Sequence, residues 1–308
     1  NLYPNKTFRQ IQFKLSGKQF GYTNASNNSF NRLKSEAVFT FKKPDPREKV
    51  INEIRYSTTY ATDLNDIITG IEQPGHQVYH NLSFLHDKTN RSINPYKLKA
   101  DFELSGKFLK TSLEAHYKFS YYKKEGFNIR LFGGTFLYKN NNLPPSYAFH
   151  LSGGSGFYDY TFDNTFLGRF EDPAKDIHNQ LLSQQFYPDD GAFALYSPLG
   201  VTNDWLLSVN LSTSLPVIKD IPIHIYGNMG AFGESMSVGT EITNKDWAME
   251  SGVKFSFLRF LDIYFPVVAS HNLEKVSDIV NNHYGEKIRF HLKFDLFKPS
   301  EMYKRMDL

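Results

Sequence analysis

The chain has 308 residues, with 35 Lys and Arg against 32 Asp and Glu, and its net charge of +3 excludes the strongly basic surface that is typical of nucleic-acid binding. It has no cysteine, which excludes disulfides and thiolate metal sites. No window approaches the ~18 consecutive apolar residues of a membrane-spanning helix. A mean hydropathy of −0.45 still allows a membrane β-barrel, because alternating side chains lower the average.

The first half of the chain alternates apolar and polar residues with the period of a β-strand. Within 95–105, for example, Leu98 and Phe102 would share one face, while the charged Lys99 and Asp101 would share the other. The same pattern, broken by Gly, Pro and Asn turns, predicts strands over 7–17, 31–43, 50–62, 76–87, 95–105, a stretch after Gly106, 126–138 and 147–153.

The stretch 154–202 interrupts this rhythm. It is too long for an ordinary turn, and long irregular loops are usually functional or partly structured. We expect one irregular strand inside it, near 191–197. We also expect the stretch to fold into a barrel lumen or over one mouth, as a plug or as a docking site for a partner. The candidate residues of this segment are Asp159, Tyr160, Asp163, Gly168, Arg169, Gln184, Gln185, Asp190 and Gly191.

Alternation resumes at Trp205 and predicts further strands at 221–232, 247–257 and 261–269. The last stretch, 287–297, alternates most strictly. Its apolar face runs from 288 to 296, a length close to the ~9–11 residues that a tilted strand needs to cross a bilayer. Its other face is nearly all charged, which suits a water-filled lumen. The apolar residues of this final membrane strand are Ile288, Phe290, Leu292, Phe294 and Leu296.

Together these segments predict an all-β fold, an antiparallel transmembrane β-barrel of about 14 strands (range 12–16) that forms a single domain over residues 1–308. A soluble β-sandwich or small barrel also alternates, but about fourteen strands would enclose a lumen too wide for side chains to fill. Short turns would lie on one side and long loops, including 270–284, on the other. Two points conflict with this arrangement. The 105–108 turn is short but falls on the long-loop side, and the long stretch 154–190 falls on the short-turn side.

Candidate chemistry is sparse. His76 and His80 are four residues apart, but on a strand that spacing is ~13 Å, so we expect no metal site there. A group of carboxylates in the interrupted stretch could bind Ca²⁺ or act in acid–base chemistry, although solvation or pairing with Arg169 explains it better. These carboxylates belong to Asp159, Asp163, Glu171 and Asp172.

From about residue 95 onward, several segments resemble one family. They are NIRLFGGTFL (128–137), DYTFDNTFLGR (159–169), the pairs Gln184-Gln185 and Asp190-Gly191, NDWLLSVNLSTSLP (203–216), LDIYFPVVAS (261–270) and YGEKIRFHLKFDLFKP (284–299). In these segments the chain resembles the C-terminal region of Bacteroidota proteins related to aminopeptidase-N-type (gluzincin) zinc metallopeptidases. The resemblance implies an outer-membrane β-barrel preceded by a peptidase-like domain.

The chain departs from that family at the residues that would make it an enzyme. A gluzincin needs His-Glu-x-x-His on a helix, with two zinc ligands and a general base, and this sequence has no such motif. We therefore expect no catalytic, cofactor-binding or metal residues in this chain. Because it begins at Asn1 without Met, we expect a processed or partial product whose N-terminal domain is missing.

The favoured function is a non-catalytic barrel in the bacterial outer membrane that anchors a peptidase-like protein or serves as a subunit of an outer-membrane complex. Its partners would be outer-membrane lipid and other envelope proteins, without nucleic acid or a cofactor. The first alternative is a passive or gated channel. The second is a barrel-embedded hydrolase of lipid or peptide, which would depend on a His such as His116 or His150, although no spacing selects a catalytic set.

Overall fold

The chain forms two compact units. The computed structural model describes residues 7–21, 29–43, 50–62, 76–89, 93–122, 125–141, 143–156, 158–169, 180–214, 223–234, 246–257 and 260–293. Unit 1 comprises Asn1–Phe119 and Gly133–Pro144, and unit 2 comprises Ser120–Phe132 and Pro145–Leu308.

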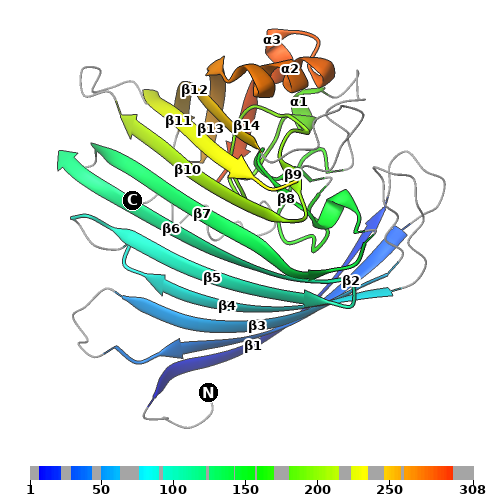
Figure 1. Ribbon diagram of the computed structural model, residues 1–308. Helices are drawn as coiled ribbons and strands as arrows, with labels where there is room; N and C mark the ends of the chain where they lie inside the picture. Colours follow the sequence, from blue (N-terminus) through cyan, green and yellow to red (C-terminus); the bar gives the residue numbers. More distant parts are fainter. Residues whose placement is uncertain are drawn as a thin grey trace. The chain divides into compact units, whose positions relative to one another are not determined.

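Unit 1 is an antiparallel meander in which each strand pairs with the next one in the chain (Figure 1). Sequential antiparallel strands joined by short connections pair most readily with their chain neighbours. The strands are β1 (Phe8–Gly21), β2 (Ser29–Phe41), β3 (Ile51–Thr62), β4 (His76–Asp87), β5 (Tyr96–Ser105), most of β6 (Phe108–Tyr122) and the end of β7 (Glu125–Lys139).

The two faces of the unit 1 sheet differ in chemistry. On one face Ile54 lies opposite Phe84, and Phe84 lies opposite Ala100, so apolar side chains form rows across the strands. The exposed apolar members of this face are Phe13, Leu15, Leu33, Tyr56, Tyr60, Phe84, Leu98, Phe102, Leu104, Leu113, Tyr117 and Phe119. The other face carries ion pairs, such as Lys14 with Glu36 at 2.9 Å and Lys99 with Asp101 at 2.8 Å.

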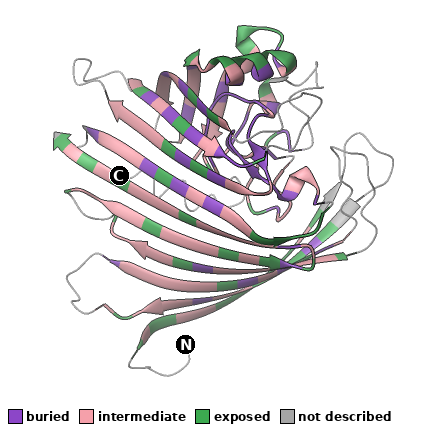
Figure 2. Cartoon of the chain, viewed as in Figure 1, coloured by how far each residue is buried: buried purple, intermediate pink, exposed green. Residues whose placement is uncertain are grey.

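Unit 2 contains five strands that pair antiparallel in chain order. They are β10 (Trp205–Ser214), β11 (Ile223–Phe232), β12 (Asp246–Phe257), β13 (Leu261–Ala269) and β14 (Arg289–Leu292). Buried and exposed residues alternate along β10, β11 and β12 (Figure 2). The exposed face again bears large apolar side chains, namely Leu207, Val209, Ile225, Met229, Trp247, Met249 and Phe257.

The core of unit 2 lies between the other face of this sheet and the residues that precede β10. Phe186, Phe193 and Leu151 are each fully buried, and Phe186 packs against Tyr264 with ring centroids 5.1 Å apart. Unit 2 also holds η1 (Pro145–Tyr147), β8 (Phe149–His150), α1 (Gln180–Ser183), β9 (Val201–Thr202), α2 (His271–Val280) and α3 (Tyr284–Lys287). None of the helices among the described residues is long and apolar enough to cross a membrane.

The expected all-β, antiparallel class is confirmed. The main sheet has twelve strands among the described residues, within the expected range, and its hydrogen-bonded order follows the chain from β1 to β7 and then from β10 to β14. β4 spans 76–87 and β13 spans 261–269, as the alternation predicts. β1 is longer than expected, because it continues to Gly21.

Three expectations are wrong. The stretch 147–153 supplies only the two residues of β8, which pair with β9 in a separate two-stranded sheet. Residues 191–197 form no strand; Phe193 makes a single bridge to Ser152. The expected loop 270–284 contains α2 and the start of α3, because Leu273 and Val276 recur at helical spacing and are buried.

These corrections remove the conflict over the long stretch. Without strands at 147–153 and 191–197, residues 140–204 become one connection, from β7 to β10. Successive connections of an antiparallel meander alternate between two ends of the sheet. Within unit 2 the connection that precedes β10 therefore falls in chain order with the long connections that precede β12 and β14, and it no longer counts among the short turns.

The last strand is shorter than expected. β14 begins at Arg289 and ends at Leu292, so Ile288 lies just before it, and Phe290 and Leu292 lie within it. Phe294 and Leu296 lie outside the described residues. Arg289 points to the buried side, as its place on the charged face predicts.

Candidate functional site

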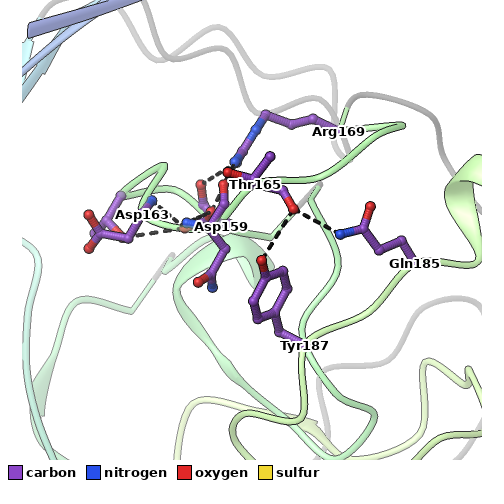
Figure 3. Close-up of polar contacts among 8 residues, drawn as sticks. Asp159, Asp163, Thr165, Arg169, Gln185 and Tyr187 are labelled. Atoms are coloured by element: carbon purple, nitrogen blue, oxygen red, sulfur yellow. Dashed lines mark hydrogen bonds and ion pairs between the residues drawn. The ribbon is translucent and has the colours of Figure 1, made fainter. Parts of the chain in front are cut away.

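The candidate site is the insertion, residues 145–204 of unit 2, together with the strands that hold it. Its first loop, 158–169, is closed by Asp159 and Arg169, whose Oδ2 and guanidinium nitrogen are 3.0 Å apart (Figure 3). The Asp159 carboxylate also accepts the N–H groups of Asp163 and Asn164 at 3.2 and 3.0 Å. A short side-chain acceptor bonding to nearby backbone N–H groups is what stabilises such turns.

Arg169 is held on several sides. Its guanidinium lies over the rings of Phe162 and Phe166, at 4.9 and 5.2 Å from their centroids, and it donates to the Asn164 carbonyl. Arg169 and Asp159 are both largely buried, so a bonded ion pair replaces the water that each group loses. The ion pair between Asp159 and Arg169 therefore closes residues 158–169 into an ordered loop.

Gln185 fastens this loop to the second half of the insertion. Its side-chain Oε1 accepts the Leu167 N–H at 2.7 Å, and its Nε2 donates to the Thr165 carbonyl at 2.8 Å. The Tyr187 hydroxyl donates to the same carbonyl at 3.3 Å (Figure 3). Gln185 is only 1% exposed, so both ends of its amide need these partners.

The segment 184–186 also extends the edge of the sheet. The Phe186 N–H donates to the Phe290 carbonyl at 2.9 Å, and the Phe290 N–H donates to the Gln184 carbonyl at 3.2 Å. This is a parallel bridge alongside β14. The Gln184 side chain adds a bond of 2.6 Å to the Gly285 carbonyl in α3. The insertion therefore pairs with the last described strand through main-chain atoms.

A row of polar side chains crosses four strands beneath the next segment, 190–195. This polar row consists of Arg130, Asn210, Asn228 and Glu250, on β7, β10, β11 and β12. Asn210 lies opposite Asn228, and Asn228 lies opposite Glu250. Arg130 donates to Asn210 at 2.9 Å, Asn210 donates to Asn228 at 3.1 Å, and Asn228 donates to Glu250 at 2.6 Å.

The polar row binds main-chain groups of the insertion. Arg130 donates to the Asp190 carbonyl at 2.7 Å, Asn210 to the Gly191 carbonyl at 2.8 Å, and Asn228 to the Ala192 carbonyl at 3.4 Å. The Glu250 carboxylate accepts the N–H groups of Ala194 and Leu195 at 2.6 and 2.8 Å. Because this segment forms no strand, only some of its backbone groups find main-chain partners, and the N–H groups of Ala194 and Leu195 are bound by the Glu250 side chain instead.

Glu250 is 2% exposed, and a carboxylate so deeply buried is stable only with several donors and a nearby cation. Its three donors are described above. Arg289 lies nearby, 1% exposed, with its guanidinium 4.5 Å from the Phe186 ring centroid and bonds of 3.5 Å to the carbonyls of Ala194 and Gly153. β12 and β14 thus place an acidic side chain, Glu250, and a basic side chain, Arg289, beside residues 194–195.

The backbone of the segment is unusual where the polar row meets it. Asp190 and Ala192 have φ of 40° and 55°, in the left-handed region that non-glycine residues seldom adopt. A Cβ on Gly191 would come within 2.5 Å of the Leu151 carbonyl oxygen, so only glycine fits there without a shift of the backbone. From the other side, Ser277 of α2 and Asn281, which follows the helix, both donate to the Tyr196 carbonyl, at 3.0 and 3.2 Å.

No family model and no curated protein matches this chain. Among solved structures, CdiB from Acinetobacter baumannii is similar to it, with a TM-score of 0.39 and 12% sequence identity. The similarity covers 86% of this chain and 45% of that chain, so this chain spans less than half the length of CdiB. At this score the similarity carries no argument about function.

The residues expected to form the plug or docking segment all lie in the insertion. Asp159, Arg169, Gln184, Gln185, Asp190 and Gly191 make the contacts described above. Tyr160 packs edge-on against Tyr147 with centroids 4.9 Å apart, Asp163 takes part through its backbone, and Gly168 is buried.

Other candidates have structural partners. The His80 Nδ1 lies 2.8 Å from the Tyr56 hydroxyl, and the His76 ring stacks on Tyr60 at 5.5 Å. His116 bonds Glu114 at 2.8 Å, and the buried His150 stacks on Tyr158 at 4.0 Å. Among the described residues there is no group of three metal-ligating side chains. Glu171 and Asp172 lie outside the described residues.

The polar row was missed by sequence reasoning. Each member occupies an inward position of a strand where alternation allows any polar residue, so Asn228 and Glu250 resemble ordinary lumen residues in the sequence. What distinguishes them is their register, which places Asn210, Asn228 and Glu250 side by side. Alternation fixes the face of a residue but not its level on the neighbouring strand.

Proposed function

We propose that this chain is a β-barrel of the bacterial outer membrane that anchors a larger protein or serves as a subunit of an envelope complex. The observation that carries the proposal is the apolar, exposed face of the sheet in each unit. Twelve large apolar side chains on β1–β6 of unit 1 are exposed on one face, and seven on β10–β12 of unit 2. Exposed apolar surface of this extent marks contact with a membrane or a partner.

The opposite faces support the same proposal. In unit 1 this face carries ion pairs, between strands and within them, that remain partly exposed, as the wall of a watery lumen does. In unit 2 it is covered by the insertion. We therefore propose that the insertion plugs the lumen or covers one mouth, and that the barrel works as a scaffold more than as a pore.

The proposed membrane placement is tested with the two tryptophans, Trp205 and Trp247. Both belong to the apolar face of unit 2. Trp247 and Leu207 lie opposite the same residue, Ala231, on the two sides of β11. Trp205 is two residues before Leu207 on β10 and therefore shares its face. They also lie near the starts of β10 and β12, at one end of the unit 2 sheet, where aromatic residues of membrane barrels gather.

The protein is reconstituted in vesicles of lipids whose acyl chains carry bromine, which quenches tryptophan fluorescence. The tryptophan emission is compared with that in vesicles of unbrominated lipid. We expect more than about half of the emission to be quenched, in wild type and in the variants Trp205→Phe and Trp247→Phe, because each remaining ring would touch lipid. Emission that is unchanged by bromine, from protein that stays folded, would refute the membrane barrel.

A channel is the second candidate, favoured by one observation. The charged face of unit 1 is partly hydrated, with the Lys14 side chain 56% and the Arg55 side chain 43% exposed. Planar-bilayer recordings separate the two functions, because a plugged anchor predicts silence and a channel predicts steady conductance.

The link to a peptidase-like domain is also part of the proposal, supported by the resemblance of residues 128–137 and 159–169 to gluzincin-related proteins. It is tested by the intact mass and N-terminal sequence of the protein extracted from native outer membranes. A mass far above 35.6 kDa would support a preceding domain. A mass equal to that of these residues would refute it.

A further inference from the structure

Three polar side chains interrupt the apolar face of unit 1. Ser35 on β2 lies opposite Thr58 on β3, and Thr58 lies opposite His80 on β4, so the three form one row across neighbouring strands. Each of them is two or four residues from an exposed apolar side chain on its own strand, and therefore shares its face. These three residues are called the polar patch.

The His80 ring uses only one of its two nitrogens within the chain. Its Nδ1 lies 2.8 Å from the Tyr56 hydroxyl and 3.2 Å from the Thr58 hydroxyl. Among the described residues, neither its Nε2 nor the hydroxyl of the exposed Ser35 has a hydrogen-bond partner. A neutral imidazole has one donor and one acceptor nitrogen, so Nε2 needs a partner whichever nitrogen carries the proton.

A second histidine on the same face of β4 is satisfied within the chain. The Nδ1 of His86 lies 2.6 Å from the Asn52 Oδ1, and its Nε2 lies 3.3 Å from the Tyr96 hydroxyl. His86 is one residue from the end of β4, whereas His80 is four residues from the start. Acyl chains offer no hydrogen-bond partner, whereas water and headgroups near the strand ends do. The histidine placed deeper in the acyl region is therefore the one that needs a partner from another molecule.

The polar patch is complementary to itself. Its two hydroxyls both donate and accept, so they can serve the His80 Nε2 of a second copy in either protonation form. The surroundings allow a close approach. Ala37 is two residues from Ser35 on the same face, and a Cβ on the neighbouring Gly17 would meet no atom within 4 Å. Small residues beside polar ones are typical of contacts between membrane-spanning segments.

We propose that this chain forms a dimer within the membrane, in which the polar patch on β2, β3 and β4 contacts the same patch of a second copy. The inference rests on the proposed membrane barrel and names the partner that it meets. Two chains inserted in the same direction can place one patch face to face through a two-fold axis along the membrane normal, the commonest symmetry of protein dimers.

The test uses single cysteines, because the chain has no cysteine of its own. Leu33→Cys lies beside the polar patch, and Leu113→Cys lies on the same face of β6; the parent side chains are 49% and 64% exposed. Each full-length variant is reconstituted in vesicles over a series of protein-to-lipid ratios and treated with a short bis-maleimide. We expect Leu33→Cys to give crosslinked dimers at ratios at least about tenfold lower than Leu113→Cys does.

Adding Thr58→Val and His80→Leu to the Leu33→Cys chain removes the hydrogen-bonding groups and suits a lipid-facing surface. We expect the ratio for half-maximal crosslinking to rise by about tenfold. The matched control adds Asn52→Leu and His86→Leu, which replace the other histidine and its partner on the same face of the same two strands. The control should crosslink as the Leu33→Cys chain does.

Equal crosslinking at the two cysteine positions would overturn the inference, and so would the absence of dimers at every ratio. Crosslinking that is unchanged by Thr58→Val and His80→Leu would overturn it as well. Each of these results presupposes protein that floats with the vesicles on a density gradient. Protein that stays folded but does not float would instead refute the membrane barrel itself, so the two failures are distinguishable.

Discussion

Glu250→Ala is the perturbation that should most affect the insertion. It removes the acceptor of three buried donors, the N–H groups of Ala194 and Leu195 and the amide of Asn228. A buried donor left without a partner costs about 1–3 kcal/mol, so three cost about 3–9 kcal/mol. Because the smaller side chain admits water to the site, we expect the lower end, about 3 kcal/mol.

The assay is hydrogen exchange, read by mass spectrometry, of peptides that cover residues 190–197 in protein held in lipid nanodiscs. A loss of about 3 kcal/mol lowers protection by about 150-fold, since 1.36 kcal/mol corresponds to a factor of ten. Glu250→Gln keeps one acceptor oxygen but turns an N–H₂ group toward a backbone N–H, so its protection should fall by about tenfold or more.

Glu36→Ala is the matched control. Glu36 is a carboxylate of the charged face in unit 1, bonded to Lys14 at 2.9 Å and 3.9 Å from Arg55. Partly exposed pairs of this kind contribute less than about 1 kcal/mol, so residues 190–197 should exchange as in wild type. If Glu250→Ala left their protection within about twofold of wild type, the polar row would not hold the insertion.

Three further substitutions test separate contacts of the insertion. Gly191→Ala places a Cβ 2.5 Å from the Leu151 carbonyl oxygen, so thermal melting should show destabilisation of about 1–3 kcal/mol, and an unchanged Tm would refute the tight fit. Gln185→Ala removes two buried hydrogen bonds and should speed chymotrypsin cleavage within 158–169 by about tenfold, whereas the half-buried Gln184→Ala should change it less than threefold. Arg169→Lys loses the planar stacking and should behave like Gln185→Ala in the same digest, and a wild-type digest would contradict this role.

The fold could be predicted from sequence where strands carry two unlike faces. β4 and β13 begin and end at the expected residues because period-two alternation there reports a real difference between the faces. The insertion could not be predicted in this way. Its backbone turns at Asp190 and Ala192 through positive φ, which neither residue type signals, and its partners lie on strands distant in sequence.

The candidate site was predicted in part for the same reason. Asp159 and Arg169 are close in sequence, so their pairing could be expected from the chain alone. Glu250 meets the insertion across 55 and 56 residues of chain, and only the register of β11 against β12 places it there. α2 was missed because ten residues inside an expected loop gave only Leu273 and Val276 as a helical signal.

The bridge between residues 184–186 and β14 has a consequence for the order of assembly. Arg289 reaches Ala194 and Gly153 across 95 and 136 residues of chain, and Phe290 closes the bridge to Phe186. The insertion can therefore complete its contacts only when the C-terminal end of the chain is present, and long-range contacts of this kind form slowly. Until then the core around Phe186 stays open on the side of Arg289, and apolar surface exposed in this way makes a folding chain prone to aggregate.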